Sequence, residues 1–369
     1  MKNIYTQTLL ILTATFTLTY CTFNKSFRVS NTLYTNDNFL YIASYNIFNL
    51  GHIASKYKKP QGAHSSDSIP QRIQNNAQLL AKRNLDLIVL QEVVAGKSGE
   101  WALADLTHQL NTNYGKRYKW LLSKEIGPGF GFRESIAFLY DSIKVTTEKK
   151  IKIIPSNGGR NFVKCSFQSG NFDFTLIGVH LSWSNAEHRI TEVKKINSIL
   201  YHPTKYASDP DVIVLGDFNR FGNNQKAVKG INFSPKKMFC PTIEFWDPQF
   251  NDVKQVSALS IQGKGIPSDD PQLLSTTVSN NHMAYDMVLC SSDVKEEFHT
   301  SIEDMKYDVN FGVIAFDHPT SPNYIQASQG KNIKYQWSDH RPVWVRFQTN
   351  RDTEDHHEPF LKIINRNLR

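Results

Sequence analysis

Seven short apolar runs, each bordered by polar residues, constrain the fold of this chain more than any other feature of its sequence. Runs of this length, rich in β-branched and aromatic residues, are typical of buried strands. Long amphipathic helices or membrane spans would need longer apolar patterns. The seven predicted strands are Phe39–Tyr45, Leu85–Leu90, Ser135–Tyr140, Phe174–Val179, Asp211–Leu215, Asp286–Cys290 and Val343–Phe347.

Helical patterns lie between some of these runs. In Gln71–Arg83, and again in Glu187–Leu200, apolar residues recur every three or four positions and so form one apolar face. Strands that alternate with helices, together with pairs that resemble hairpins, predict an α/β (α+β) protein with mixed β-sheets.

The composition limits the class of protein without choosing its function. The chain has 369 residues, of which 40% are hydrophobic and 21% charged, and this is typical of a globular protein. Its formal charge of +8 favours polyanionic partners, either nucleic acid or an anionic lipid surface.

The first residues resemble an export signal. Lys2 precedes a short apolar stretch, Leu9–Tyr20, which ends at Cys21 and is too short for a comfortable membrane span. The letters LTYC resemble a loose lipoprotein signal, so Cys21 is either a lipidation site or part of an ordinary cleaved signal. We therefore expect an exported protein, extracellular or held at the cell envelope, that meets a membrane only through such an anchor. The predicted order is a signal (1–21), a linker (22–38), one catalytic domain (39–349) with insertions near 51–70 and 230–281, and a charged tail (350–369).

The other cysteines do not predict a metal site. Cys165, Cys240 and Cys290 form no C-x-x-C pair, which argues against zinc. Cys165 and Cys290 lie in apolar runs and are predicted to be small core residues. One disulfide is compatible with the sequence, which does not specify its partners.

Polar side chains gather at the ends of the predicted strands. Asn46, Glu92 and His180 each follow a run, and Asp217 and Asn219 follow another. The last two runs reverse the order, because Asp286 and the pair Asp339–His340 precede them. If those two strands run opposite to the others, all these groups reach one edge of the sheets, where α/β proteins bind ligands.

Such a cluster has the chemistry of phosphoryl transfer. Carboxylates and amides are hard oxygen ligands that suit Mg²⁺, Mn²⁺ or Ca²⁺. Two histidines can supply a base and an acid, and each needs a carboxylate partner, for which Glu134 and Asp286 are available. The chain has no GxxxxGK[ST], GxSxG or HExxH motif, which argues against a P-loop hydrolase, a serine hydrolase and a zinc protease.

Seven motifs in order resemble the endonuclease/exonuclease/phosphatase superfamily. They are SYNIFNLG, LIVLQEV, RESIAFLY, GVHLSW, VIVLGDFN, AYDMVL and SDHRPVWV, and they extend from about Tyr41 to Phe347. Within that superfamily the chain looks most similar to deoxyribonuclease I and to bacterial and mycoplasma membrane nucleases. The resemblance implies a four-layer sandwich of two mixed β-sheets flanked by helices. It also implies a magnesium-dependent endonuclease of low sequence specificity, with DNA as the partner.

The resemblance also implies a role for each side chain. Glu92, assisted by Asn46 and with Asp339 nearby, would ligate the metal. His180 with Glu134 and His340 with Asp286 would form two acid/base pairs, Asp217 and Asn219 would position water or stabilise charge, and Arg160 would hold a phosphate oxygen.

Alternatives remain at the level of single residues and of substrate. Taken alone, His180 is also explained as a core histidine, Asp286 as a turn cap and Arg160 as a loop charge. The chain departs from deoxyribonuclease I at Val94 and at Phe132, where that enzyme has an arginine and a tyrosine. A phospholipid phosphodiesterase or phosphatase of the same superfamily, sphingomyelinase-like or inositol-phosphatase-like, is the alternative function.

Overall fold

The computed structural model describes residues 38–52, 68–128, 133–219, 238–239, 285–298, 311–317, 325 and 333–350. The predicted export signal with Cys21, the linker up to residue 37, most of both insertions, Phe132 and the charged tail lie outside these residues. Contacts divide the chain into Met1–Asn38 and Phe39–Arg369, and nearly all described residues belong to the second unit.

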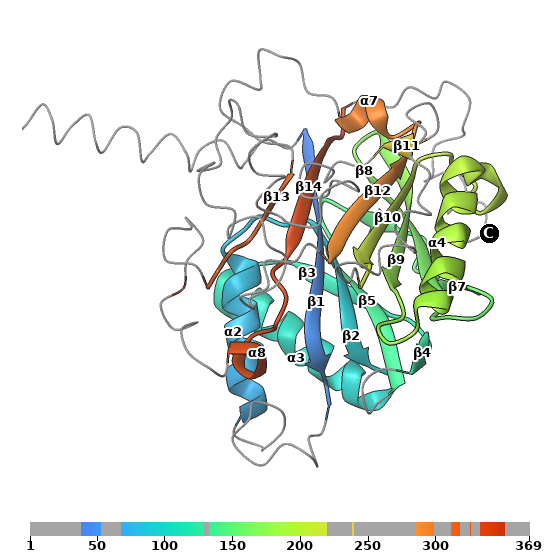
Figure 1. Ribbon diagram of the computed structural model, residues 1–369. Helices are drawn as coiled ribbons and strands as arrows, with labels where there is room; N and C mark the ends of the chain where they lie inside the picture. Colours follow the sequence, from blue (N-terminus) through green and yellow to red (C-terminus); the bar gives the residue numbers. More distant parts are fainter. Residues whose placement is uncertain are drawn as a thin grey trace, which may run out of the picture. The chain divides into compact units, whose positions relative to one another are not determined.

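The first sheet contains the first strand of the unit Phe39–Arg369. Its order is β13-β14-β1-β2-β5-β3, with β4 paired to β5 (Figure 1). Strand β1 is parallel to β2 and antiparallel to β14, and β5 is antiparallel to β2. The strands span Phe39–Leu50 (β1), Leu87–Val94 (β2), Tyr118–Leu122 (β3), Gly127–Pro128 (β4), Arg133–Asp141 (β5), Phe311–Val313 (β13) and Val343–Gln348 (β14).

The second sheet has the same mixed character. Its order is β11-β12-β10-β9-β8-β6, with β7 paired to β8. Strands β9 and β10 are parallel, whereas β12 is antiparallel to β10 and β8 is antiparallel to β9. The strands span Thr146–Thr147 (β6), Lys152–Ile154 (β7), Phe162–Ser169 (β8), Phe172–His180 (β9), Val212–Asp217 (β10), Met238–Phe239 (β11) and Asp286–Ser291 (β12).

The two sheets pack face to face around a shared apolar core. Val89 and Phe138 of the first sheet belong to the same buried cluster as Cys165 and Leu176 of the second. The rings of Phe138 and Phe167 lie 5.5 Å apart across the interface between the sheets. Cys165 and Cys290 are buried in this core, which confirms their predicted place.

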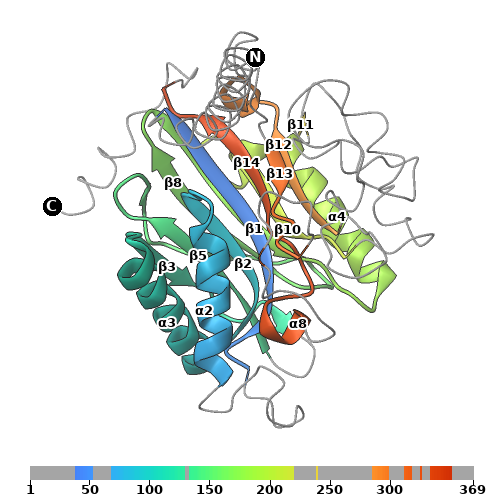
Figure 2. The same ribbon diagram turned by 90° about the vertical axis from the view of Figure 1, so that its left-hand side faces the viewer.

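Helices cover the outer faces of both sheets. Helices α2 (Ser68–Ala81) and α3 (Lys97–Tyr114) contact each other and cover the first sheet, as Figure 2 shows. Helix α4 (Ala186–Tyr201) packs Val193 and Ile196 against β9 and β10 of the second sheet. These four layers confirm the predicted sandwich. The short helical elements are η2 (Pro203–Lys205), α7 (Lys295–Phe298) and α8 (Ile333–Gln336).

All seven predicted strands are present, with ends that differ by a few residues. Helix α2 begins at Ser68, so the last residues assigned to the first insertion belong to its first turn, where Pro70 is tolerated because those N–H groups have no helical partner. Helix α3 and strands β3 and β8 were not predicted. No helix in the described part of the chain has the length and apolar content needed to cross a membrane.

Candidate active site

The strand directions bring the predicted side chains to one edge of the two sheets. Strands β14 and β12 run opposite to β1 and β10, as the reversed order of their polar residues predicted. In the second sheet, Asp217 lies opposite His180 on one side and opposite Asp286 on the other. The beginnings of β5, β12 and β14 therefore meet the ends of β1, β2, β9 and β10.

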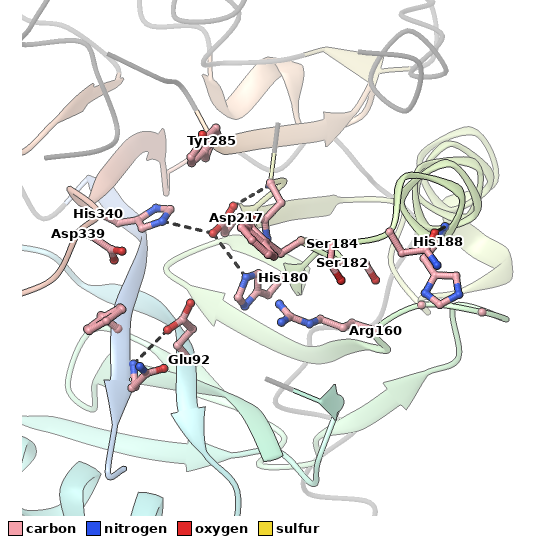
Figure 3. Close-up of a pocket in the computed structure, with 17 residues that line it drawn as sticks. Glu92, Arg160, His180, Ser182, Ser184, His188, Asp217, Tyr285, Asp339 and His340 are labelled. Atoms are coloured by element: carbon pink, nitrogen blue, oxygen red, sulfur yellow. Dashed lines mark hydrogen bonds and ion pairs between the residues drawn. The ribbon is translucent and has the colours of Figure 1, made fainter. Parts of the chain in front are cut away.

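A cleft of about 910 Å³ opens at this edge (Figure 3). Asn46, Glu134 and Asp286 lie behind its surface, buried and in contact with the residues that line it. The predicted site residues that line the cleft are Glu92, Arg160, His180, Asp217, Asn219, Asp339 and His340.

Each of the two histidines is held by a buried carboxylate. The Nδ1 of His180 lies 2.5 Å from Oε1 of Glu134, and the Nδ1 of His340 lies 2.8 Å from Oδ2 of Asp286. Such contacts fix the orientation of an imidazole and stabilise its charged form. The two predicted histidine–carboxylate contacts are therefore present, while the acid/base roles remain predictions.

Asp217 lies between the two imidazoles. Its Oδ2 is 3.5 Å from Nε2 of His180 and 3.5 Å from Nε2 of His340 (Figure 3). Burial alone would raise the pKa of Asp217, but the two histidines and the backbone N–H of Asn219 lower it overall. Asp217 is thus an anion that both Nε2 atoms face.

The neighbouring carboxylates raise the pKa of both histidines. Burial would lower the pKa of His180, but Glu134 and Asp217 raise it above its ordinary value. The pKa of His340 is raised well above its ordinary value, because Asp286 and Asp217 outweigh the same effect of burial. A charged imidazole can donate a proton to a leaving oxygen, and a neutral imidazole can accept one from water.

Glu92 lies in the same cleft, on the side of Asp217 opposite Arg160. It accepts hydrogen bonds from Nδ2 of Asn46 at 3.0 Å and from the backbone N–H of Asn49 at 3.2 Å. Burial raises its pKa to about 7, although His180 opposes this, and Asp339 and Glu134 raise it further. Two partly buried acidic residues, Glu92 and Asp339, therefore lie close enough for their charges to interact.

These residues fit a hard divalent cation. The Oδ1 of Asp339 is buried and has no hydrogen-bond partner among the described residues. Over the same residues, no three His, Cys, Asp or Glu side chains group as metal ligands, so protein carboxylates would supply only part of a coordination shell. Mg²⁺ is commonly bound in this way, through one or two carboxylates and several waters.

Asn46 has contacts that differ from those of a simple metal ligand. Its Nδ2 donates to Glu92 and, at 3.1 Å, to Oδ2 of Asp217, while its Oδ1 accepts from the backbone N–H of Phe48 at 3.0 Å. Asn46 therefore links the carboxylates of the two sheets, and direct ligation through its oxygen stays a prediction.

Irregular backbone directs several of these side chains into the cleft. Glu92 has a φ of 58° at a point where the β2–β5 register shifts, and Asn219 has a φ of 45°. Such conformations are uncommon for residues other than glycine and gather at functional sites. Gly216, before Asp217, has a φ of 152°, and a Cβ there would lie 1.8 Å from the Val179 carbonyl oxygen. Only glycine allows this approach.

Arg160 lies on the cleft beside the first histidine pair. Its guanidinium is 3.4 Å from Oε2 of Glu134 and donates to the Leu181 carbonyl at 3.4 Å. Its backbone N–H donates to Oε1 of Glu192 at 2.6 Å. In Figure 3, Glu92 and Asp339 lie on one side of Asp217, and Arg160 lies on the other.

Sequence analysis missed three buried charged residues that hold the site from behind. Arg72 of α2 donates to the carbonyls of Ile47 and Phe48, at the end of β1. Arg189 and Glu192 of α4 contact the segment after His180. A signal existed, because Arg72 and Glu192 each precede an apolar residue of the buried helix face. A charge at such a place is rarely buried without a partner.

Comparisons with known proteins support the fold. No protein-family model matches the chain, and no curated protein matches it. One similar solved structure is an endonuclease/exonuclease/phosphatase family protein from Bacteroides thetaiotaomicron, which is 15% identical with a TM-score of 0.51 over 84% of this chain and 97% of that one. Another is a mannosyl-6-phosphatase from Bacteroides thetaiotaomicron VPI-5482, also 15% identical with a TM-score of 0.51, over 84% of this chain and 99% of that one. The chain therefore has the fold of endonuclease/exonuclease/phosphatase proteins.

Proposed function

We propose that this protein is an exported, metal-dependent phosphodiesterase that hydrolyses nucleic acid, with DNA as its principal substrate. One observation carries the proposal. Two imidazoles, each supported by a buried carboxylate, direct their Nε2 atoms toward Asp217 in a single cleft. This arrangement supplies an acid and a base on a common site, as hydrolysis of a phosphate ester requires.

In the proposed reaction, one histidine accepts a proton from water while the water oxygen attacks phosphorus. The other histidine donates a proton to the leaving oxygen as the phosphorus–oxygen bond breaks. Asp217 and Asn219 position the water, and Arg160 binds a non-bridging phosphate oxygen through charge-assisted hydrogen bonds. The three side chains line the same cleft as both histidines, which supports this assignment.

Glu92 and Asp339, with Asn46 behind them, would hold the cation. We propose Mg²⁺, with Mn²⁺ or Ca²⁺ as substitutes, because the donors are all oxygens. When bound, such a cation neutralises developing charge on the phosphate. The buried Oδ1 of Asp339, which has no partner in the described part of the chain, and the raised pKa of Glu92 support a cation at this place.

The choice of substrate rests on charge and on sequence resemblance. A formal charge of +8 favours a long polyanion, and the ordered motifs resemble those of deoxyribonuclease I and membrane nucleases. The export signal belongs to the same proposal, with Cys21 either as a site of lipidation or as part of an ordinary cleaved signal. A phosphatase or phospholipid phosphodiesterase is the second candidate, and the observation that favours it is that a phosphatase shares this fold.

The deciding experiment compares substrates with the purified protein, Mg²⁺ and Ca²⁺. Plasmid DNA, single-stranded DNA, RNA, sphingomyelin and mannose 6-phosphate are assayed in parallel. The proposal expects plasmid nicking, and a His180→Ala variant prepared in the same way excludes a contaminating nuclease. Hydrolysis of sphingomyelin or mannose 6-phosphate with intact DNA would replace the proposed substrate by the second candidate.

A further inference from the structure

An exposed tryptophan lines the cleft close to the catalytic histidine pair. Trp183 is 57% exposed and lies three residues after His180. Other large hydrophobic side chains in the described part of the chain are also exposed, but Trp101, Tyr114 and Ile143 do not line this cleft. A large exposed aromatic side chain at a polar cleft is a characteristic of ligand-binding surfaces.

The backbone that carries Trp183 is held by two buried charged residues of α4. Arg189 donates from one guanidinium nitrogen to the Ser182 carbonyl at 2.7 Å and to the Trp183 carbonyl at 2.5 Å. Glu192 accepts from the Ser182 backbone N–H at 2.9 Å and from its hydroxyl at 2.8 Å. Burying charges is costly, so their use to hold this short segment indicates that its position matters.

The same carboxylate also holds Arg160. The backbone N–H of Arg160 donates to Oε1 of Glu192, the same oxygen that accepts a hydrogen bond from the Ser182 hydroxyl. The Trp183 segment and Arg160 are therefore fixed to one buried group. In Figure 3, Arg160, Ser182 and Ser184 lie together on the side of the cleft that faces α4.

We propose that Trp183 is a stacking platform for a nucleobase next to the phosphate bound at His180 and Arg160. The inference rests on the proposed nucleic-acid substrate and adds a base-binding subsite to it. Three residues span at most about 10 Å, so the indole lies within a few nucleotides of the histidine. Stacking accepts any base, because every base has a π-face, and this agrees with low sequence specificity.

A quaternary ammonium group, as in a choline lipid, is the other ligand that tryptophan binds well. The structure favours a nucleobase over a quaternary ammonium group as the ligand of Trp183. The backbone of Arg160 is held by the same buried carboxylate as the Trp183 segment, so the cationic Arg160 guanidinium lies on this side of the cleft and would repel a second cation. A neutral base beside an anionic phosphate meets no such repulsion.

Binding to two oligomers with the same phosphates tests the platform. One probe is a thymidylate octamer, and the other is an octamer of abasic tetrahydrofuran phosphates. Dissociation constants are measured with Mg²⁺ in a His180→Ala background, with His340→Ala as a second background. The parent should bind the thymidylate octamer about tenfold or more tightly than the abasic one. Trp183→Ala should remove this preference while leaving the affinity for the abasic octamer unchanged.

Two variants control for the loss of an aromatic side chain in general. Trp183→Phe should keep most of the preference, and Trp101→Ala, which removes an exposed tryptophan from α3, should keep all of it. If Trp183→Ala retains the preference, the platform is refuted. Equal binding of both octamers together with Trp183-dependent binding of phosphocholine would assign the indole to a choline group instead. DNA hydrolysis by the wild-type protein is assayed separately, so its failure would refute the proposed function rather than this subsite.

Discussion

At the scale of single residues, the paired histidines differ from the other histidine of the cleft. His180 and His340 are buried against carboxylates, whereas His188 lines the cleft from α4 and is exposed. We expect His180→Ala and His340→Ala each to lower kcat by about a hundredfold or more, the usual contribution of a positioned acid or base. His188→Ala is the matched control and should retain nearly full activity. Plasmid-nicking rates measure the turnover of all three variants. Near-normal turnover in His180→Ala or in His340→Ala would contradict the acid/base role proposed for that histidine.

The residues that line the cleft were predictable because they stand next to strand runs. Glu92, His180 and Asp217 each follow a short continuous apolar run, and such runs are recognised without knowledge of the fold. In the sequence, Trp183 is notable only as part of the GVHLSW motif, because the residue type does not show whether a side chain is exposed. Arg72 and Glu192 were missed for the opposite reason. A charged residue on a helix normally faces solvent, and the place of these two beside an apolar helix face is a weak signal that they are buried.

Among the structural elements, helix α2 fixes the end of β1 through one side chain. Arg72 donates to the carbonyls of Ile47 and Phe48, and its Nε donates to the Trp337 carbonyl at 3.4 Å, just before Asp339. Arg72→Met would leave these acceptors without donors, so we expect a loss of about 2–4 kcal/mol in the free energy of unfolding. It should also weaken Mg²⁺ binding, because Asn49 and Asp339 follow the carbonyls that it holds.

Urea unfolding and calorimetric titration with Mg²⁺ check both effects of Arg72→Met. Gln71→Ala removes an exposed side chain from the same helix and is the control, since its contact with Asn75 is also exposed. Unchanged Mg²⁺ affinity in a folded Arg72→Met protein would show that the helix supports stability alone.

The pairing of β9 with β10 depends on the absence of a side chain at Gly216. A Cβ there would lie 1.8 Å from the Val179 carbonyl oxygen, and the φ of 152° is itself unfavourable for other residues. Gly158 has a similar φ of 148°, but a Cβ there would meet no atom within 4 Å. Gly216→Ala should therefore lower the melting temperature more than Gly158→Ala, and should also impair turnover by displacing Asp217. Equal melting temperatures of the two variants would show that β9 and β10 accommodate a Cβ at position 216 by moving apart.

Elements were predicted best where their sequence pattern is strong. The buried strands appear as nearly continuous apolar runs, and all seven were found. Helix α3 was missed because its buried face includes Gly99, Ala102 and Thr107, which weaken the apolar stripe. Strand β8 alternates buried Phe162, Val163, Cys165 and Phe167 with partly exposed polar residues, a pattern that predicts a half-buried strand. The sequence of β8 therefore contains the alternating pattern of a half-buried strand.

At the scale of the whole molecule, the site exists only where the two sheets meet. Asn46 of the first sheet donates to Asp217 of the second, although 171 positions separate them in the chain. The Ser338 hydroxyl donates to the Asn46 carbonyl across 292 positions. The contact between Asn46 and Asp217 forms only in the packed sandwich, so loosening of the interface between the sheets should separate the residues of the cleft before the individual strands are lost.

The same convergence concentrates negative charge, and a bound cation should therefore stabilise the whole protein. Glu92 is partly buried near the charge of Asp339, which is unfavourable without a cation. We expect Mg²⁺ at a hundredfold excess over its Kd to raise the free energy of unfolding by about 2.7 kcal/mol. EDTA should abolish turnover, and Mg²⁺ or Mn²⁺ should restore it.

Glu92→Gln separates the electrostatic cause from general damage to the site. Without a cation, this variant lacks the partly buried charge of Glu92 and should melt at a higher temperature than the wild-type protein. With Mg²⁺ the order should reverse, because the wild-type protein gains the binding energy and the variant does not. Glu125→Gln, which removes an exposed carboxylate paired with Arg133, should leave the response to Mg²⁺ intact. Thermal melting with and without Mg²⁺ measures all three proteins, and a Glu92→Gln variant that Mg²⁺ stabilises as strongly as the wild type would place the cation elsewhere.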